Sequence, residues 1–519
     1  MKEETESIGR RSVRTLSSLL IGRAGSIILN AITFIAVARL LGPSSYGIYT
    51  LAVGIYSLIG AVGHFGIGTY FNKHISEYIY RKKPQKINEV LSAGYSIILP
   101  IALALTLIGI AGSGTIASYF KSQSLPAITV VIASLILFFS MLYGAVYPAL
   151  VSFGRGRWAA YTIIVVQLAN LVGSVSLILA GLDYNGALIG SMLSYAVGFA
   201  LTFYYIAKAM KPFGGFTFIK VGFKKIKKVL YFSLPMAANN FVNNSVLNFG
   251  TVMLSLYTIS TVLGNYGVAL KGLNLLQVFY GTISVVLLPT FSAIIARKSK
   301  VSSSFNKVLI YSLIITLPVI FYIGIFSKPL ISFLITKKYS TAPFYLLLIS
   351  LGTALGLPAL YSSSFIVGKG KVLKVLKYST FSAVIQFLAL LYLVPSWGAF
   401  GAITSIFIIG GLINDFLFLS GVKRLFGVKV ELGPIIKIFG VNFLLAALMA
   451  PSFLLHSDLL VLLSGLLIGT LLYPILLLVS KTISMKSIND IKGYSQDIPI
   501  IGRLTDFIIS YLKYFVRER

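Results

Sequence analysis

The chain has 519 residues, of which 57% are hydrophobic and only 11% charged, and it carries a formal net charge of +31 with no cysteine. A soluble protein of this length needs about 25% charged residues to cover its surface, so the composition excludes a soluble globular protein and indicates a surface that faces lipid. The lack of cysteine excludes disulfides, zinc-thiolate sites and thiol nucleophiles, and we expect no cofactor and no metal. Basic residues stand in short blocks between apolar runs, which favours orientation in a membrane over nucleic-acid binding.

Apolar runs along the chain predict an all-α integral membrane protein with about fourteen transmembrane helices, since about 20 residues cross the hydrocarbon core. The first run follows a cluster of arginines, and its length favours a retained membrane helix over a cleaved signal peptide. The fourteen helices are expected to begin near Thr15, Tyr46, Glu89, Pro126, Ala159, Gly186, Leu230, Val262, Lys307, Ala342, Val375, Gly398, Ile435 and Leu459.

The positive charges predict the orientation of these helices. If the N-terminus is cytoplasmic, nearly all lysines and arginines fall in cytoplasmic segments, so both termini are expected on the cytoplasmic side of the cell membrane. The exceptions are four lysines in external loops, Lys121, Lys328, Lys337 and Lys338, and three cations within helices, Arg23, Arg39 and Lys271.

A faint internal repeat predicts how the helices are grouped. The recurring pairs are Tyr46-Gly47 with Tyr266-Gly267, the turn 154–157 with the turn 368–371, and Gly186-Ala187 with Gly398-Ala399. Six helices separate the members of each pair, so two six-helix lobes should be related by a pseudo-twofold axis along the membrane normal. We expect lobes at 1–210 and 229–424, a basic cytoplasmic linker at 211–228 and helices 13 and 14 within 425–484. Helical spacing of apolar residues in 485–519 favours an amphipathic tail at the inner leaflet over a frayed end.

Several of these segments resemble a known family. They are the stretch ARLLGPSSYGIY at 38–49, the entry to the seventh helix at 232–235 and the two Gly-basic-Gly-basic turns. They are similar to polysaccharide and O-antigen (Wzx-type) flippases of the multidrug/oligosaccharidyl-lipid/polysaccharide (MOP) exporter superfamily, and the resemblance covers nearly the whole chain. It implies a flippase, not an enzyme, that moves isoprenoid phosphate- or pyrophosphate-linked oligosaccharides from the inner to the outer leaflet by alternating access. Surface polysaccharide or glycoprotein assembly is the implied purpose, with membrane lipids and a glycan polymerase or transferase as further partners.

Cations inside the predicted helices mark a candidate binding site, because charge is costly there. Arg23 shares a face of the first helix with Asn30, and Lys271 lies one turn from Asn274 in the eighth. Arginine forks onto phosphate oxygens and lysine acts as a point charge, so both suit the anionic group of a lipid-linked sugar. The resemblance adds that related lipid II flippases carry cavity cations in the first and eighth helices. Alternatively, Arg23 snorkels to the interface and Lys271 bonds a backbone carbonyl; snorkelling is preferred for Arg39.

Amides and one acid complete the candidate residues. Asn240, Asn244 and Asn248 recur every four residues in the seventh helix, and this polar stripe either binds sugar hydroxyls or bonds neighbouring helices. Asp415 is the only acid well inside a predicted helix, and it either binds a proton or sodium counter-ion or pairs with a buried cation. Gln167, Asn170 and Gln386 are weaker candidates. The sequence does not say which of the 30 tyrosines and 36 phenylalanines stack on sugars.

Three other functions are open to such a chain. A multidrug or organic-cation exporter of the same superfamily would need cavity carboxylates, and Asp415 stands alone against two cations. A membrane glycosyltransferase would need paired external acids, whereas Asp183 and Asp458 lie singly in short loops. A scaffold or receptor is disfavoured by repeated halves that each bury a charge.

Overall fold

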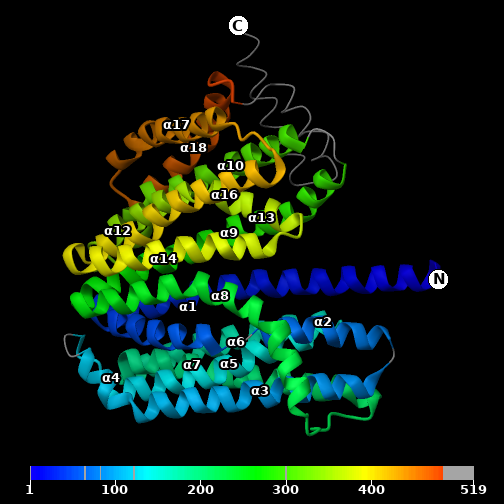
Figure 1. Ribbon diagram of the computed structural model, residues 1–519. Coiled ribbons are helices and arrows are strands. Elements are labelled where there is room, and N and C mark those ends of the chain that lie inside the picture. The colour runs from blue at the N-terminus through cyan, green and yellow to red at the C-terminus, as the bar shows by residue number, and fades with distance from the viewer. Residues whose placement is uncertain (1, 64–65, 82, 121–122, 298–300, 483–519) are drawn as a thin grey trace. The chain divides into compact units, whose positions relative to one another are not determined.

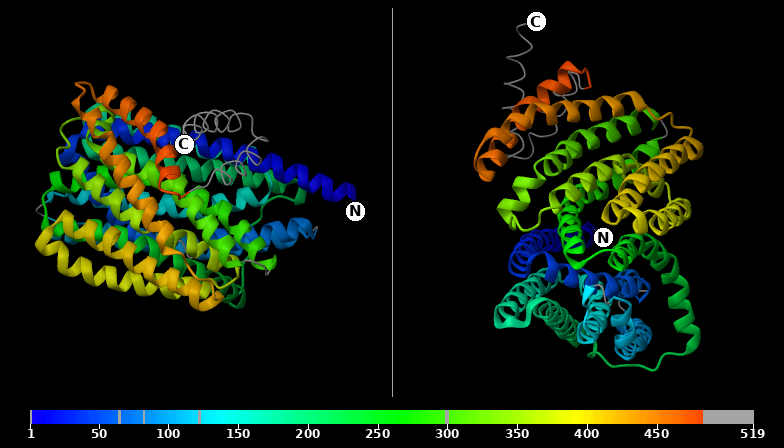
Figure 2. Two further views of the ribbon diagram at one scale, coloured as in Figure 1. Left: turned by 90° about the horizontal axis from the view of Figure 1, so that it is seen from above. Right: turned by 90° about the vertical axis from the view of Figure 1, so that its left-hand side faces the viewer.

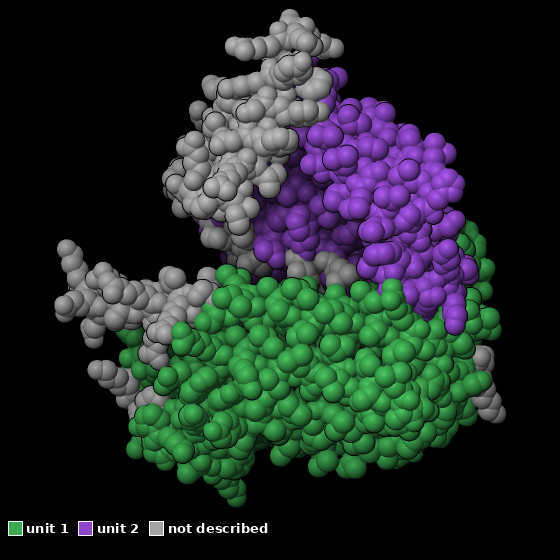
Figure 3. All heavy atoms as spheres, turned by 180° about the vertical axis from the view of Figure 1, so that it is seen from behind, with its two compact units in different colours: residues 1–271, 379–406 green, residues 272–378, 407–519 purple. Residues whose placement is uncertain are grey.

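The computed structural model describes residues 2–63, 66–81, 83–120, 123–297 and 301–482, and these are almost entirely helical (Figure 1). The chain divides into two compact units, coloured in Figure 3. Unit 1 comprises residues 1–271 and 379–406, and unit 2 comprises residues 272–378 and 407–519. These boundaries differ from those of the predicted lobes, so the division into six-helix lobes stays a prediction. The predicted tail at 485–519 lies outside the described residues.

Nine helical stretches among the described residues are long and apolar enough to cross a membrane, or ten if one bent pair counts as a single span. The chain is therefore a multi-pass membrane protein. The stretches Ser18–Ala61 and Gly156–Met210, of 44 and 55 residues, are each long enough for two crossings. Positive φ angles of 69° at Gly42 and 90° at Gly181 interrupt them. The exact count of fourteen stays a prediction.

Unit 1 is a bundle in which α6 packs on α1 and α7, and α5 packs on α3 and α7 (Figures 1 and 2). Its core contains fully buried Phe71, Leu91 and Met141. The unit also contains the first part of α9 (Ser260–Arg297) and most of α14 (Val372–Trp397). Its other helices are α1 (Lys2–Gly63), α2 (Ile67–Tyr80), α3 (Pro84–Ala111), α4 (Ser113–Tyr119), α5 (Ala127–Ser152), α6 (Gly156–Leu177), α7 (Asp183–Met210), α8 (Phe223–Tyr257) and α15 (Ala399–Ile403).

Unit 2 is built around an aromatic core. The Phe365 ring lies 5.2 Å from that of Phe291 and 4.8 Å from that of Phe305, between centroids. α12 and α13 form a broken span, bent by 41°. Besides the remainder of α9 and α14, the helices are α10 (Val301–Ile325), α11 (Ser327–Leu334), α12 (Ala342–Leu355), α13 (Leu357–Gly368), α16 (Gly410–Phe426), α17 (Leu432–Met449) and α18 (Asp458–Val479).

The internal repeat is visible as an asparagine clamp that occurs once in each unit. Asn88, near the start of α3, holds the extended segment after α7: its Nδ2 donates to the Gly215 carbonyl at 3.1 Å and its Oδ1 accepts from the Thr217 N–H at 3.4 Å. Asn306 in α10 makes the same two bonds to residues 429 and 431, which follow α16, at 2.8 and 3.1 Å. The same local architecture is therefore built twice from one chain.

The repeated basic turns also match, in a slightly different register. Positive φ angles of 68° and 76° occur at Gly154 and Gly370, where glycine is favoured because it lacks a Cβ atom. The structure thus aligns Gly154 with Gly370, whereas the sequence pattern aligns it with Gly368. The two alignments differ by two residues.

A close crossing of backbones joins α1 to the start of α9 within unit 1. A Cβ atom on Gly47 would lie 1.9 Å from the Ser260 carbonyl oxygen, and one on Gly264 would lie 1.9 Å from the Pro43 carbonyl oxygen. The Ser44 hydroxyl approaches that of Ser260 at 3.5 Å. This reciprocal contact gives the GPSSYG motif of residues 42–47 a physical role, since only glycine fits at the crossing.

Candidate substrate-binding site

Arg23 is placed on α1 by close packing of that helix against α6. A Cβ on the preceding Gly22 would lie 2.6 Å from the Ala160 side chain, so the two helices touch at this level. The Arg23 side chain is exposed, and it has no acidic partner among the described residues. Tyr147 of α5 lies within electrostatic reach of it. Arg23 therefore offers a fixed positive charge beside a phenol.

A row of amides continues from Arg23 along α1 and α6. The Asn30 Nδ2 donates to the Gln167 Oε1 at 3.5 Å. One turn further along α6, the Asn170 Oδ1 accepts hydrogen bonds from Ser174 at 2.9 Å and from Ser191 of α7 at 3.3 Å. The structure thus joins the strong candidate Asn30 with Gln167, which the sequence ranks as weak. The sequence does not show which helices lie side by side, so the pairing of Asn30 with Gln167 could not be predicted from it.

The eighth-helix candidates occupy α9 at the boundary between the units. Lys271, the last residue of unit 1 in this part of the chain, is half-buried, and Asn274 one turn later is exposed. Among the described residues, Lys271 forms no ion pair. The proposal that Lys271 and Arg23 act on one substrate stays a prediction.

The asparagine stripe of α8 is partly used within its own helix. The Asn248 Nδ2 donates to the backbone carbonyl of Asn244 at 3.0 Å, while the Asn244 side chain is exposed. The side chain of Asn240 lies outside the described residues. Gln386 of α14 is also satisfied locally, because its Nε2 donates to the Ser382 hydroxyl at 2.8 Å. Of these candidates, Asn244 is the one described at the surface of unit 1.

Asp415 of α16 caps the broken span in unit 2. Its Oδ1 accepts a hydrogen bond from the Ala359 N–H at 2.7 Å. Ala359 lies in the first turn of α13, just after the break at Gly356, where backbone N–H groups have no helical partner. A carboxylate is favoured there by both hydrogen bonding and the helix dipole. The sequence shows an acid inside a membrane helix but does not show that it faces a helix end.

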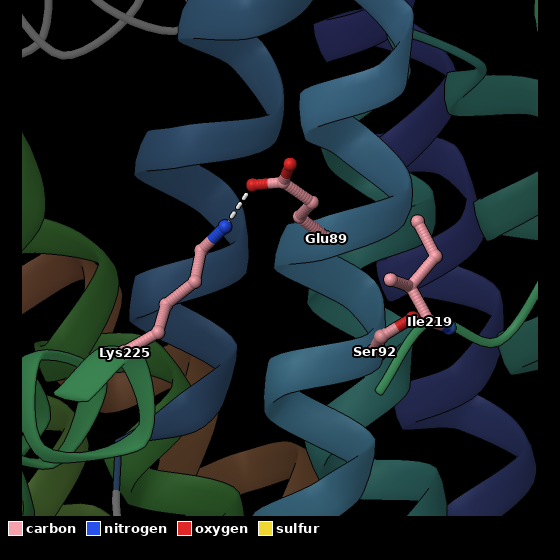
Figure 4. Close-up of polar contacts among 4 residues, drawn as sticks. All are labelled: Glu89, Ser92, Ile219 and Lys225. Carbon is pink, nitrogen blue, oxygen red and sulfur yellow. Dashed lines mark hydrogen bonds and ion pairs between the residues drawn. The ribbon is translucent and has the colours of Figure 1, made fainter. Parts of the chain in front are cut away.

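The basic linker, residues 211–228, runs along the first turns of α3 and is hydrogen-bonded to them. Lys225 donates to the Glu89 carboxylate, and the Ser92 hydroxyl accepts from the Ile219 N–H at 3.0 Å; Figure 4 shows these four residues. The side chains of Lys225 and Glu89 are 37% and 41% exposed, so the ion pair adds little stability. The linker is therefore an ordered segment packed against α3.

The adjoining α2 lies outside the candidate spans and carries a perturbed histidine. Burial, and then the charge of Lys73, lowers the pKa of His74 below its ordinary value. Its ring lies 4.6 Å from that of Tyr70, between centroids. His74 is therefore neutral near pH 7.

Comparison with known proteins places the fold. Residues 12–295 match the family described as "Polysaccharide biosynthesis protein". A structure titled "Lipid II flippase MurJ, inward closed conformation" is similar with a TM-score of 0.65 and 17% identity, over 88% of this chain and 97% of that one. An inward-facing multidrug resistance MATE family transporter of the MOP superfamily is similar with a TM-score of 0.63 and 15% identity, over 78% of this chain and 98% of that one.

A further similar structure is a MOP superfamily transporter from Pyrococcus furiosus, with a TM-score of 0.53 and 16% identity, over 80% of this chain and 95% of that one. No curated protein sequence matches the chain. The chain therefore has the fold of MOP superfamily transporters.

Proposed function

We propose, from the premise that this chain belongs to the polysaccharide biosynthesis protein family, that it is a flippase for oligosaccharides linked to an isoprenoid phosphate or pyrophosphate. Arg23 carries the proposal: it is a guanidinium within a membrane helix and has no acidic partner among the described residues, and Asn30, two turns further along the same helix, is hydrogen-bonded to Gln167. Placing such a charge in a membrane helix costs free energy, so its presence there indicates a function. The guanidinium fork matches phosphate oxygens, and the amides match sugar hydroxyls.

Transport proceeds by alternating access in this proposal. The headgroup enters from the cytoplasmic side and meets Arg23 and Lys271, with Asn244 and Asn274 as further contacts, while the isoprenoid stays in the bilayer. The crossing of α1 with α9 at Gly47 then separates, and the headgroup leaves toward the outer leaflet. The excess of positive charge in one set of loops favours cytoplasmic termini, which defines the cytoplasmic side in this proposal.

The driving ion is proposed to be a proton or sodium ion bound at Asp415. Its carboxylate already bonds the first turn of α13, so occupation by a cation would change the attraction between α16 and the broken span. This links ion binding to a bend in unit 2.

An organic-cation exporter is the second candidate, since similar structures are titled multidrug transporters. Arg23 argues against it, because its positive charge would repel a cation. A glycosyltransferase is less well supported than a transporter, given the family and the similar structures. The two external acids, moreover, are separately engaged: Ser45 donates to Asp183 at 2.8 Å, and Ser332 donates to Asp458.

The test uses purified protein in proteoliposomes with a fluorescent isoprenyl diphosphate disaccharide, whose access to an impermeant glycosidase reports translocation. Arg23→Ala and Lys271→Ala are each expected to slow translocation at least about tenfold, since a charge-assisted bond is worth roughly 1.5–3 kcal/mol. Arg39→Ala is the matched control, because that arginine lies at the outer end of the first helix and should leave the rate unchanged. Wild-type translocation rates in both Arg23→Ala and Lys271→Ala would refute the proposal.

A further inference from the structure

Five tyrosines from three helices of unit 1 form a group that we call the tyrosine column. The ring of Tyr143 on α5 lies 5.6 Å from that of Tyr147 and 6.2 Å from that of Tyr195 on α7, between centroids. Tyr49 and Tyr56 of α1 pack with Tyr195 against one buried cluster, which contains Ala52 and Leu188. All five side chains are half-buried, so each keeps part of its surface accessible.

Local sequence spacing sets this column. Tyr143 and Tyr147 are four residues apart and therefore lie one above the other on α5. Gly198, one turn after Tyr195, makes room for the next ring, since a Cβ there would lie 2.9 Å from a ring carbon of Tyr143. The column is thus packed to a specific geometry.

Polar groups border the aromatic faces. The Tyr49 hydroxyl bonds Ser191, which in turn donates to the Asn170 Oδ1 at 3.3 Å. The Tyr147 hydroxyl donates to the Ala159 carbonyl at 3.4 Å. Aromatic faces suit the C–H face of a pyranose ring, and adjacent hydroxyls and amides suit its hydroxyl edge.

One end of the column adjoins the proposed phosphate ligand, because Tyr147 lies within electrostatic reach of Arg23. A headgroup held by its phosphate at Arg23 would therefore bring its first sugar to Tyr147 and Tyr143. Further sugars would extend toward Tyr195 and Tyr49. Successive tyrosines on α5 are separated by about 6 Å along the helix, close to the length of one sugar ring.

We propose that this tyrosine column, Tyr147, Tyr143, Tyr195, Tyr56 and Tyr49, is an oligosaccharide-binding track that reads the glycan beyond its phosphate. The inference rests on the proposed flippase function and assigns the sugar contacts that the sequence alone does not choose. Its consequence is that the protein distinguishes a glycosylated carrier from a bare one, and a longer glycan from a shorter one.

The experiment measures binding to the full-length protein in lipid nanodiscs. The probes are farnesyl diphosphate and farnesyl diphosphate carrying one or three N-acetylglucosamine residues. Wild type should bind the trisaccharide probe tightest. Tyr143→Leu and Tyr195→Leu should each weaken trisaccharide binding about fivefold to tenfold and leave bare farnesyl diphosphate unchanged. Tyr205→Leu is the matched control, because that α7 tyrosine stacks on Trp158 at 5.1 Å, outside the column.

The outcomes separate the track from the flippase proposal. Equal losses for bare and glycosylated probes, or no loss at all, would overturn the track. If Arg23→Gln retains full affinity for bare farnesyl diphosphate, the phosphate site fails, whatever the tyrosines do. Should a leucine variant fail to fold, Tyr143→Met and Tyr195→Met take its place, because they also remove the aromatic face, and the same loss is expected for the trisaccharide only; unchanged binding by both would also reject the track.

Discussion

Replacing Gly47 with alanine tests the crossing between α1 and α9. The new Cβ atom would lie 1.9 Å from the Ser260 carbonyl oxygen, a backbone atom that cannot rotate away. Ordinary contact needs more than 3 Å, so the two backbones must separate by over 1 Å. Overpacking of this kind costs roughly 1–3 kcal/mol, which exceeds the gain of up to about 1 kcal/mol from alanine's helix propensity. We expect a net loss of stability.

Two measurements check this expectation. Thermal unfolding of purified protein should begin at a lower temperature in Gly47→Ala than in wild type. Because the chain has no cysteine, a disulfide between Ser44→Cys and Ser260→Cys reports the crossing directly, since the parent hydroxyls lie 3.5 Å apart. We expect rapid oxidation in the parent and slow oxidation when Gly47→Ala is added.

Gly25→Ala provides the matched control on the same helix. A Cβ there would lie 3.7 Å from the Ile164 side chain, which is ordinary contact. This variant should therefore be as stable as wild type or more so. If Gly47→Ala unfolds and oxidises like Gly25→Ala, the crossing is not closely packed and the reasoning fails.

Three further expectations follow from polar contacts. Asn88→Ala and Asn306→Ala should each lower the free energy of unfolding by about 1–3 kcal/mol, because two hydrogen bonds are lost. Hydrogen exchange should rise only in the segment that the replaced asparagine holds. A rise in both segments in either variant would contradict two separate clamps. Asp415→Asn should keep the hydrogen bond to Ala359 and near-native stability. Asp415→Leu should lower the free energy of unfolding by about 1 kcal/mol, because the helix cap is lost. Equal melting temperatures of the two variants would disprove capping. Since its folded pKa is lowered, His74 contributes stability at neutral pH that is lost as pH falls below the unfolded value of 6.5. The protection of α2 against hydrogen exchange, corrected for the intrinsic rate at each pH, should fall from pH 7.5 to 5.5, and His74→Gln should abolish that fall.

The sequence predicts the membrane class and the superfamily because those follow from composition and short motifs. Apolar runs need no tertiary information, and the GPSSYG motif is local. The predicted helix starts near Tyr46 and Gly186 agree with the breaks at Gly42 and Gly181, and the helices appear longer in the structure because helical turns continue on both sides of each positive φ angle. The number of crossings within such merged stretches depends on backbone angles that hydropathy does not encode.

The residues of the candidate site can be selected from the sequence in part, and their role stays a prediction. Arg23 and Asn30 stand out because polar residues are rare in membrane helices, and the structure sets Gln167 beside Asn30. The role of Asp415 as a cap depends on Gly356, which lies far from it in the chain. The tyrosine column is invisible in the sequence, because tyrosines on three helices share no spacing.

The clamp at Asn88 also changes what kind of connector residues 211–228 form. A free basic segment of that length would act as a slack tether with many conformations. Hydrogen bonds to Asn88 and Ser92 instead hold it along α3 up to the start of α8. A movement of α3 would therefore be passed to the start of α8 through these bonds, which a slack tether would not do.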